Sequence, residues 1–274
     1  SLVFEVENPK GDVTIAMCGK YTDLSDSYKS LNEALRHAGI HNHARVNIEY
    51  VDSETLTPET VSQLKQFDAI LVPGGFGKRG IEGKIQAVRF AREKKIPFLG
   101  ICFGMQMAVI EAARNLAGIV DAGSTELGRP GNPVVGLMTE WVQGNERLQR
   151  QEGDDLGGTM RLGAFEAVLT PGSKVCDIYG GLSIHERHRH RYEVNNEYRE
   201  QIGNAGLVFS GTSPDGHLVE FVELPREVHP YYIATQAHPE LRSRPNNAHP
   251  LFAGLVEASL ERQKATRLFD IEKA

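Results

Sequence analysis

Cysteine, long hydrophobic runs and excess positive charge are all scarce in this sequence. The three cysteines, Cys18, Cys102 and Cys176, form an odd and widely spaced set, which excludes a disulfide framework and a paired CxxC metal site. No apolar stretch approaches the roughly 20 residues that cross a membrane, and the first residues lack the basic-then-apolar pattern of a secretory signal. We therefore expect free thiols, no membrane partner and a cytoplasmic location.

The charge balance argues against a nucleic-acid partner. Lysines and arginines number 30 against 36 acidic residues, so the net charge is -6 and no overall basic surface is expected. Hydrophobic residues make up 40% and charged residues 24% of the 274 residues, an ordinary composition for one globular α/β domain. We interpret the polar residues 1–11 as the remnant of an interdomain linker, residues 12–265 as the domain, and residues 266–274 as a C-terminal tail.

Strand and helix patterns alternate four times in the first half of the chain. This alternation, with short connections, predicts an α/β fold: a doubly wound, mainly parallel central sheet with flanking helices. Shorter strand patterns in the second half predict an antiparallel extension. The expected strands are 13–18, 46–51, 69–72, 97–101, 134–138, 164–169, 208–211 and 218–222. The expected helices are 25–37 (stopped by Gly39), 58–64, 81–93, 103–115 and 249–264, and 144–158 is expected as a surface loop.

The most informative segment is Gly100-Ile101-Cys102-Phe103-Gly104, between an expected strand and an expected helix. A strand that turns sharply into a helix is the nucleophile elbow of hydrolases, here with cysteine in the place of serine. The turn strains the backbone at the nucleophile, and close packing on both sides leaves room only for glycine. The start of the helix favours the thiolate over the thiol. Cys102 is therefore the candidate nucleophile, and the alternative is a buried structural cysteine.

A cysteine nucleophile needs a base, and we select His238 from the ten histidines. His238 lies at the end of a strand pattern, in a His-Pro-Glu turn. If the extended geometry continues through Pro239, residues two apart point to the same side. Glu240 would then reach the imidazole, fix its tautomer and support its charge. The alternative is that His238 and Glu240 are two unrelated surface residues. The presence of the Cys102 elbow in the same sequence favours the catalytic pair.

Glycines follow the expected strand 69–72 in the string Pro73-Gly74-Gly75-Phe76-Gly77. They allow backbone N–H groups to approach a ligand closely. Because the spacing matches neither the dinucleotide nor the P-loop pattern, donation to an oxyanion beside Cys102 is preferred, with a plain tight turn as the alternative. Residues 78–83 place charges between glycines and form either a mobile lid or a solvated turn.

The string His-Glu-Arg-His-Arg-His-Arg-Tyr-Glu begins at residue 185. In a strand, Arg187, Arg189 and Arg191 would share one face, with the intervening histidines on the other. The arginines would repel a cation and no cysteine joins them, so we expect no metal site. A row of arginines suits recognition of a carboxylate or phosphate. Elsewhere, Glu126 could bind a substrate ammonium.

Together these motifs resemble the class I glutamine amidotransferases, which use a Cys-His-Glu triad. Within that family they are most similar to the glutaminase domains of CTP synthases, from about Gly11 to Arg262. The resemblance is carried by residues 73–83, 100–106, 124–126, 158–163, 186–196 and 236–240. The strings Gly-Thr-Met-Arg-Leu-Gly and Arg-His-Arg-His-Arg-Tyr-Glu separate the chain from the relatives in GMP synthetase, carbamoyl-phosphate synthetase and anthranilate synthase.

The resemblance implies a role for each site residue. Cys102 attacks the side-chain amide of L-glutamine, and His238, oriented by Glu240, protonates the departing ammonia and then activates water. The N–H groups of Gly75 and Phe103 form the oxyanion hole. Substrate contacts fall to Gly75, Phe103, Gly104, Met105, Gln106, Glu126 and Arg191, with Glu126 on the ammonium and Arg191 on the carboxylate. The family usually has leucine in the place of Phe103, so the pocket wall differs while the backbone N–H is kept.

The resemblance also implies partners outside this chain. CTP synthases carry an amidoligase domain before the glutaminase domain, and it binds UTP, ATP and Mg²⁺ and uses the ammonia to convert UTP to CTP. That domain is not found in this sequence, so we expect the ammonia-producing half, in a homo-oligomer (tetramer) when complete. No cofactor is expected in the glutaminase domain itself. GTP acts in the family as an allosteric activator at a lid, here Arg79, Gly80 and Glu82.

Two other functions compete with this one. A stand-alone γ-glutamyl hydrolase would have the same triad but no evident need for the arginine-histidine string. A non-catalytic regulatory or assembly module would have lost the chemistry, and the intact set of Cys102, His238 and Glu240 argues against that loss.

Overall fold

The computed structural model describes residues 2–20, 26–75, 78–137 and 160–273. The expected surface loop 144–158 and residues Phe76 and Gly77 lie outside this described part. The strands are β1 Gly11–Gly19, β2 Ala44–Asp52, β3 Ala69–Val72, β4 Phe98–Ile101, β5 Ala122–Ser124, β6 Asn132–Leu137, β7 Arg161–Leu169, β8 Ser183–His190, β9 Tyr192–Val194, β10 Val208–Thr212, β11 Val219–Glu223 and β12 Tyr232–Thr235. The α-helices are α1 Leu2–Glu7, α2 Asp26–His41, α3 Ile81–Glu93, α4 Phe103–Asn115, α5 Lys174–Tyr179, α6 Arg199–Asn204 and α7 Pro250–Lys273.

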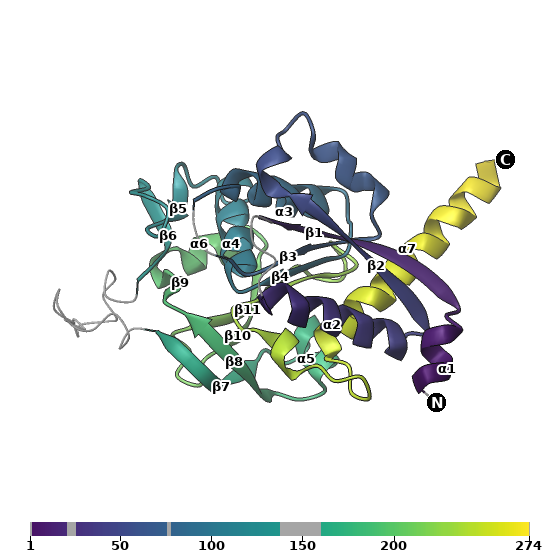
Figure 1. The fold of residues 1–274 in the computed structure, drawn as a ribbon. Coiled ribbons are helices and arrows are strands. Elements are labelled where there is room, and N and C mark those ends of the chain that lie inside the picture. The colour runs from purple at the N-terminus through teal and green to yellow at the C-terminus, as the bar shows by residue number, and fades with distance from the viewer. Residues whose placement is uncertain (1, 21–25, 76–77, 138–159, 274) are drawn as a thin grey trace.

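One large sheet runs through the molecule in the order β2-β1-β3-β4-β12-β11-β10-β7-β8 (Figure 1). The neighbours from β2 to β12 pair in parallel. The neighbours from β12 to β8 pair antiparallel. A small second sheet has the order β5-β6-β9. The fold class expected from the sequence is therefore confirmed, including the antiparallel extension in the second half.

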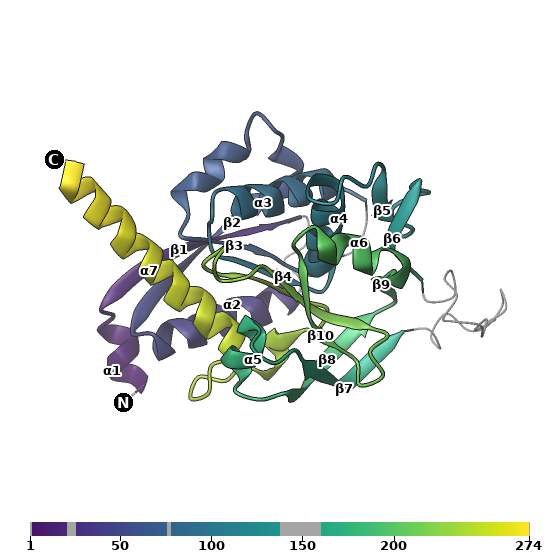
Figure 2. The same ribbon diagram turned by 180° about the vertical axis from the view of Figure 1, so that it is seen from behind.

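Helices cover both faces of the parallel strands (Figures 1 and 2). Helices α3 and α4 pack on one face over a core that contains Ile70 and Val72 of β3. Helices α2 and α7 pack on the other face over a core that contains Ala69 and Leu71 of the same strand. Successive side chains of a strand point to opposite faces, so a strand covered on both sides must be apolar throughout. This explains the unbroken apolar run of β3.

The end of helix α2 differs from the expectation. We expected Gly39 to stop this helix, but α2 continues to His41. A Cβ at Gly39 would lie 2.6 Å from the Ala44 carbonyl oxygen. Glycine is therefore needed for the close approach of the chain that enters β2, and not as a helix cap.

The expected helix 58–64 is also wrong, because a 3-10 helix, Val61–Gln66, takes its place. Threonine side chains explain the difference. The Thr60 hydroxyl donates to the Thr55 carbonyl at 2.7 Å and accepts from the Thr57 N–H at 2.9 Å. Such bonds compete with the backbone bonds of an α-helix and stabilise a turn instead.

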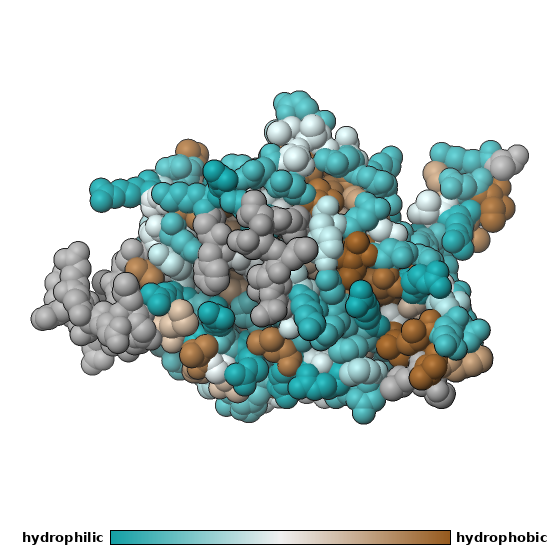
Figure 3. All heavy atoms as spheres, in the orientation of Figure 1, coloured by the Kyte–Doolittle hydropathy of each residue, from teal (hydrophilic) through white to brown (hydrophobic). Residues whose placement is uncertain are grey.

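Both ends of the described chain are helical. Helix α1 occupies most of the segment interpreted as a linker remnant, and α7 continues through the expected tail to Lys273 instead of ending at 264. Its last turns extend away from the body of the molecule (Figure 1). Leu268, Phe269 and Ile271 are exposed there, and hydrophobic side chains are visible at that end in Figure 3. No described helix is long and apolar enough to span a membrane.

Candidate active site

Three parallel neighbours, β3, β4 and β12, end at the same edge of the sheet. Gly74 and Gly75 follow β3, Cys102 follows β4, and His238 lies shortly after β12. Open α/β sheets bind ligands at the carboxyl ends of their strands. The fold therefore brings together three motifs that lie far apart in the sequence.

The backbone at Cys102 has the strain expected of an elbow. Its φ is 52° and its ψ is -102°, a combination that residues with a side chain rarely adopt. The Cys102 N–H donates to the Thr235 carbonyl at 2.7 Å, which fastens the turn to β12. A Cβ on Gly100 would lie 3.0 Å from a side chain of β12, and one on Gly104 would lie 2.1 Å from the Val72 carbonyl oxygen. Both flanking glycines are therefore required by packing.

His238 and Glu240 form the expected pair, with His238 Nδ1 2.8 Å from Oε1 of Glu240. Because a carboxylate only accepts, Nδ1 carries a proton. The imidazole also makes a hydrogen bond with Cys102, for which Nε2 is the nitrogen that is left. The connection is not extended as expected, since Pro239–Arg242 is a 3-10 helix. Proline suits the first position of a helix, where its fixed φ is already helical and no N–H is needed. The tight turn returns Glu240 to the imidazole.

The charges around His238 favour its protonated form. Burial opposes that form, but hydrogen bonds and attraction from Cys102 and Glu240 outweigh it and raise the pKa of His238 to about 10. An imidazolium beside the sulfur stabilises a thiolate. In contrast, burial raises the pKa of the Cys18 thiol to about 12, so it stays protonated and unreactive. The Cys176 thiol donates to the Gly181 carbonyl at 3.5 Å.

The two candidate oxyanion donors belong to segments that border the nucleophile. A Cβ on Gly74 would lie 3.5 Å from Cys102 Cβ and 3.2 Å from His238 Cε1, so the end of β3 runs directly against the reacting groups. Gly75 comes next in the chain. Phe103 is the first residue of α4, whose first N–H groups have no partner within the helix. This placement is compatible with an oxyanion hole.

Gly104, Met105 and Gln106, the other candidates for substrate contact, lie in the first turn of helix α4. Met105 is fully buried in the core beneath α3 and α4, so its side chain is committed to packing. Gln106 is 2% exposed, and its amide nitrogen donates to the Tyr192 carbonyl at 3.1 Å and to Gln236 Oε1 at 3.2 Å. Any contact of the Gln106 side chain with substrate must therefore use its Oε1, which has no partner.

A buried lysine that the sequence analysis did not select lies beside the glycine loop. Lys84 of α3 is 4% exposed, and its Nζ lies 3.5 Å from the position of a Cβ on Gly75 and 4.8 Å from the centre of the Phe103 ring. Burial lowers the pKa of Lys84 to about 8, against the attraction of Glu126. A lysine in a helix is normally exposed, so no sequence signal marked it.

Glu126 follows β5, and its N–H donates to the Ser124 hydroxyl at 3.3 Å. Burial raises the pKa of Glu126, although Lys84 opposes this shift. The carboxylate already has one cation nearby, so a substrate ammonium would share it with Lys84. Arg191, the other candidate for substrate binding, is half-buried between β8 and β9.

Strand β8 has the expected two faces up to His190, where it ends, so Arg191 does not continue the row of Arg187 and Arg189. The strand also reaches the site. Arg187 and Arg189 are exposed, whereas His188 and His190 are buried. The His238 N–H donates to the Arg187 carbonyl at 2.8 Å. The thiol of the nucleophile lies 4.0 Å from the Arg189 carbonyl oxygen. The strand at the far end of the sheet order therefore curls back over the catalytic residues.

The buried histidines of β8 belong to a network of charges. His188 Nε2 lies 3.1 Å from Glu220, and His190 Nε2 lies 2.7 Å from Glu193. Arg161 contacts both carboxylates, Glu220 at 2.6 Å and Glu193 at 3.4 Å. In the described ranges, no group of three or more histidine, cysteine or acidic side chains is arranged to hold a metal ion. The network joins β7, β8, β9 and β11.

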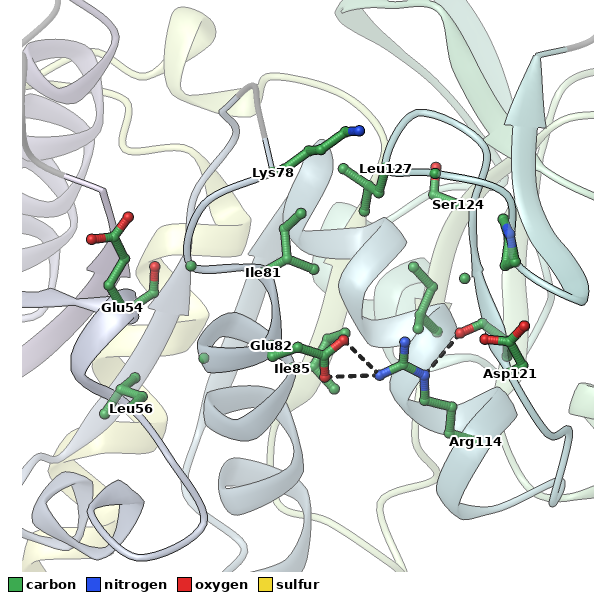
Figure 4. A pocket seen from close by; sticks show the side chains of 18 of the residues that line it. Glu54, Leu56, Lys78, Ile81, Glu82, Ile85, Arg114, Asp121, Ser124 and Leu127 are labelled. Carbon is green, nitrogen blue, oxygen red and sulfur yellow. Dashed lines mark hydrogen bonds and ion pairs between the residues drawn. The ribbon is translucent and has the colours of Figure 1, made fainter.

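The expected lid residues lie at the start of α3. Gly80, with φ 74°, precedes the helix, and Arg79 is exposed on the preceding turn. Glu82 is not part of a loop: it is helical and accepts from Arg114 of α4 at 3.0 Å. Gly80, Glu82 and Arg114 line a hollow of about 650 Å³ (Figure 4). None of the triad residues lines this hollow.

Residues 23–258 match the family described as glutamine amidotransferase class-I. The chain is 58% identical to the CTP synthase of Azospirillum brasilense over 268 residues, which cover 96% of this chain and 49% of that protein. It is 59% identical to the CTP synthase of Rhizobium johnstonii over 260 residues, which cover 94% of this chain and 48% of that protein. The chain thus spans about half the length of these curated relatives.

A solved structure supports the same grouping. The Trypanosoma brucei CTPS glutaminase domain with bound acivicin matches with a TM-score of 0.80 and 37% sequence identity, over 91% of this chain and 94% of that chain. The family match covers most of the sequence, and the elbow, the histidine and the glutamate stand together in space. This chain therefore belongs to the class I glutamine amidotransferase family.

Proposed function

We propose that this chain is a glutaminase that hydrolyses L-glutamine to glutamate and ammonia through a thioester on Cys102. The observation that carries the proposal is the strained Cys102 elbow beside the hydrogen-bonded pair of His238 and Glu240. In this pair, His238 Nδ1 lies 2.8 Å from Glu240 Oε1. The similar Trypanosoma brucei domain holds acivicin, a glutamine analogue, which supports glutamine as the substrate.

The first half of the reaction forms the thioester. The Cys102 thiolate attacks the side-chain carbonyl carbon, and the carbonyl oxygen becomes an oxyanion that accepts from the N–H groups of Gly75 and Phe103. Removing one such donor typically costs about 2.7–4 kcal/mol in the barrier. The C–N bond then breaks as the His238 imidazolium passes its Nε2 proton to the leaving nitrogen, and ammonia departs.

The second half hydrolyses the thioester. Neutral His238 takes a proton from water as the water oxygen attacks the thioester carbonyl. The second tetrahedral intermediate collapses, the C–S bond breaks, and glutamate leaves the regenerated thiolate of Cys102. Glu240 keeps the Nδ1 proton in place throughout, so that Nε2 always faces the reacting atoms.

The polar groups around the triad suit the two ends of glutamine. Arg191 would pair with the α-carboxylate, for which a guanidinium offers two parallel donors. Glu126 would accept from the α-ammonium. The buried ammonium of Lys84 would hold Glu126 ionised while no substrate is bound, since burial alone favours its neutral form.

We further propose that the ammonia serves an amidoligase partner that binds UTP, ATP and Mg²⁺ and makes CTP. Supporting this, the curated relatives are named CTP synthase and are about twice as long as this chain. In such an assembly, GTP would activate hydrolysis at Arg79, Gly80 and Glu82. We propose a cytoplasmic homo-oligomer, a tetramer, for the complete protein.

Labelling with acivicin tests the glutaminase assignment. We expect one adduct per chain, located on Cys102 by peptide mass spectrometry, and protection when excess L-glutamine is present. The variant Cys102→Ser should form no adduct, whereas Cys176→Ser should be labelled like the wild type. Labelling of Cys176, or labelling of Cys102 that glutamine does not slow, would refute a glutamine site at this thiol.

A further inference from the structure

The thiol of Cys102 has a second side chain against it besides His238. Nε2 of Gln236 lies 3.6 Å from Cys102 Sγ, within the range of a hydrogen bond to sulfur. Gln236 is fully buried, and its backbone N–H donates to the Glu220 carbonyl at 2.9 Å, which fixes the residue between β12 and β11. The reaction described above assigns no role to it.

The chain itself fixes which end of the Gln236 amide faces the sulfur. The Tyr192 carbonyl can only accept, so the Gln106 group 3.1 Å from it must be the NH₂. The same NH₂ lies 3.2 Å from Gln236, so the facing Gln236 atom must be the oxygen. The other end of the Gln236 amide, directed at Cys102, is therefore the NH₂. The orientations of both amides are therefore fixed by their donors and acceptors, even though the oxygen and nitrogen of an amide are otherwise hard to tell apart.

A donor at this position favours the ionised sulfur. Hydrogen bonds to an ionised group are stronger than hydrogen bonds between neutral groups, especially where water is excluded. The Arg189 carbonyl oxygen, 4.0 Å from the sulfur, acts in the opposite direction, because it can accept from the thiol but repels the thiolate. The other charged groups facing the sulfur are His238 and, behind it, Glu240.

We propose that Gln236 is a catalytic residue whose amide donates to the Cys102 thiolate, and that Gln106 positions it through the relay Tyr192–Gln106–Gln236–Cys102. The proposal deepens the proposed glutaminase function and rests on it for the meaning of the thiolate. No bond is made or broken by Gln236: its hydrogen bond lowers the free energy of the ionised nucleophile before attack and of the leaving thiolate after hydrolysis. Because Tyr192 directly follows Arg191, the relay also joins the thiol to the peptide that would hold the carboxylate of glutamine.

Alkylation of Cys102 by iodoacetamide across a range of pH tests the proposal without using glutamine. The variant Gln236→Met keeps the volume of the side chain and removes the donor. At neutral pH we expect alkylation of Cys102 to slow by about 10- to 100-fold, the range typical of losing a hydrogen bond to a charged group. At high pH, where the sulfur is ionised in both proteins, the two rates should converge. The ultraviolet absorbance of the thiolate should appear at higher pH in the variant.

Two further variants complete the test. Gln106→Met leaves Gln236 in place but frees its amide to turn, so it should slow alkylation in the same direction by a smaller factor. If Gln236→Met fails to fold, this variant carries the test alone. The exposed Gln66→Met should match the wild type at every pH. Circular dichroism should show a native fold for each protein compared.

The pH dependence of alkylation distinguishes a hydrogen bond to the thiolate from a change in access to Cys102. Equal rates at neutral pH in wild type and a folded Gln236→Met would overturn the proposal. A constant slowing at all pH values would also overturn it, because that result means altered access and not altered ionisation. If instead Gln236→Met shows the pH-dependent loss but the wild type hydrolyses no glutamine, the proposed function fails while the hydrogen bond to the thiolate stands.

Discussion

At the scale of single residues, Cys102 and the charge of Glu240 together keep the proton on His238. Glu240→Gln keeps the shape and removes this charge, so the imidazolium should lose its proton at a lower pH than the value of about 10 in the wild type. We expect glutamine hydrolysis to fall, but less than in His238→Ala, which removes the base itself. Steady-state ammonia release by the three proteins checks this order. Equal rates for wild type and Glu240→Gln would show that Glu240 does not orient the histidine.

Lys84 makes a prediction about stability and pH. The folded protein lowers the pKa of Lys84 from 10.5 to about 8, mainly through burial. Between these two values the unfolded chain binds more protons at this site, so Lys84 contributes more to stability as the pH rises. The free energy of unfolding of wild type minus that of Lys84→Met should therefore increase from about pH 8 to pH 10.5. Urea unfolding of the two proteins at a series of pH values measures this difference.

At the scale of secondary-structure elements, Arg161 holds β7 against β9 and β11 through Glu193 and Glu220. Arg161→Met leaves two buried carboxylates without their cation, which typically costs about 3–5 kcal/mol. Burial already raises the pKa of Glu220 to about 7 in spite of Arg161, so its charge depends on this partner. The exposed pair of Arg226 with Asp177 provides the control, and Arg226→Met should cost less than about 1 kcal/mol.

Denaturant unfolding of Arg161→Met and Arg226→Met measures the two losses in the free energy of unfolding. Adding Glu220→Gln to Arg161→Met should recover part of the lost stability, because it removes one uncompensated charge. A loss in Arg161→Met no larger than that in Arg226→Met would mean that the network does not hold these strands together.

The elements that the sequence revealed are those decided by local patterns. The bounds expected for α3 and α4 match the structure, because helical spacing and the glycine-flanked elbow are both local signals. The helix expected at 58–64 was wrong because side-chain bonds of Thr60 compete with the helix. Contacts that depend on the curl of the sheet could not be anticipated. The approach of the Arg189 carbonyl to the thiol is of this kind. The burial of Lys84 depends in the same way on tertiary packing, here beside Gly75 and the Phe103 ring.

At the scale of the whole molecule, this chain covers about half the length of its curated relatives, and the proposed amidoligase partner leads to a prediction about the chain on its own. We expect the chain alone to hydrolyse glutamine slowly and to respond weakly to GTP. Coupling between two sites typically changes a rate or affinity by roughly 5- to 150-fold. Hydrolysis should be measured with and without GTP, and with and without an amidoligase domain added in trans. A chain that alone matches the complete enzyme, with no GTP effect on either, would favour a stand-alone hydrolase.

The central claim is that Cys102 is the nucleophile that releases ammonia from glutamine. Its most direct test is ammonia and glutamate release by Cys102→Ala and Cys18→Ala, measured on proteins whose circular dichroism matches the wild type. Removing a nucleophile typically costs several orders of magnitude in rate, on the order of 10⁶-fold in one well-studied protease. The account predicts that Cys102→Ala releases no ammonia above background, whereas Cys18→Ala, which removes a buried and unreactive thiol, keeps wild-type turnover. Retained ammonia release in Cys102→Ala would contradict the account.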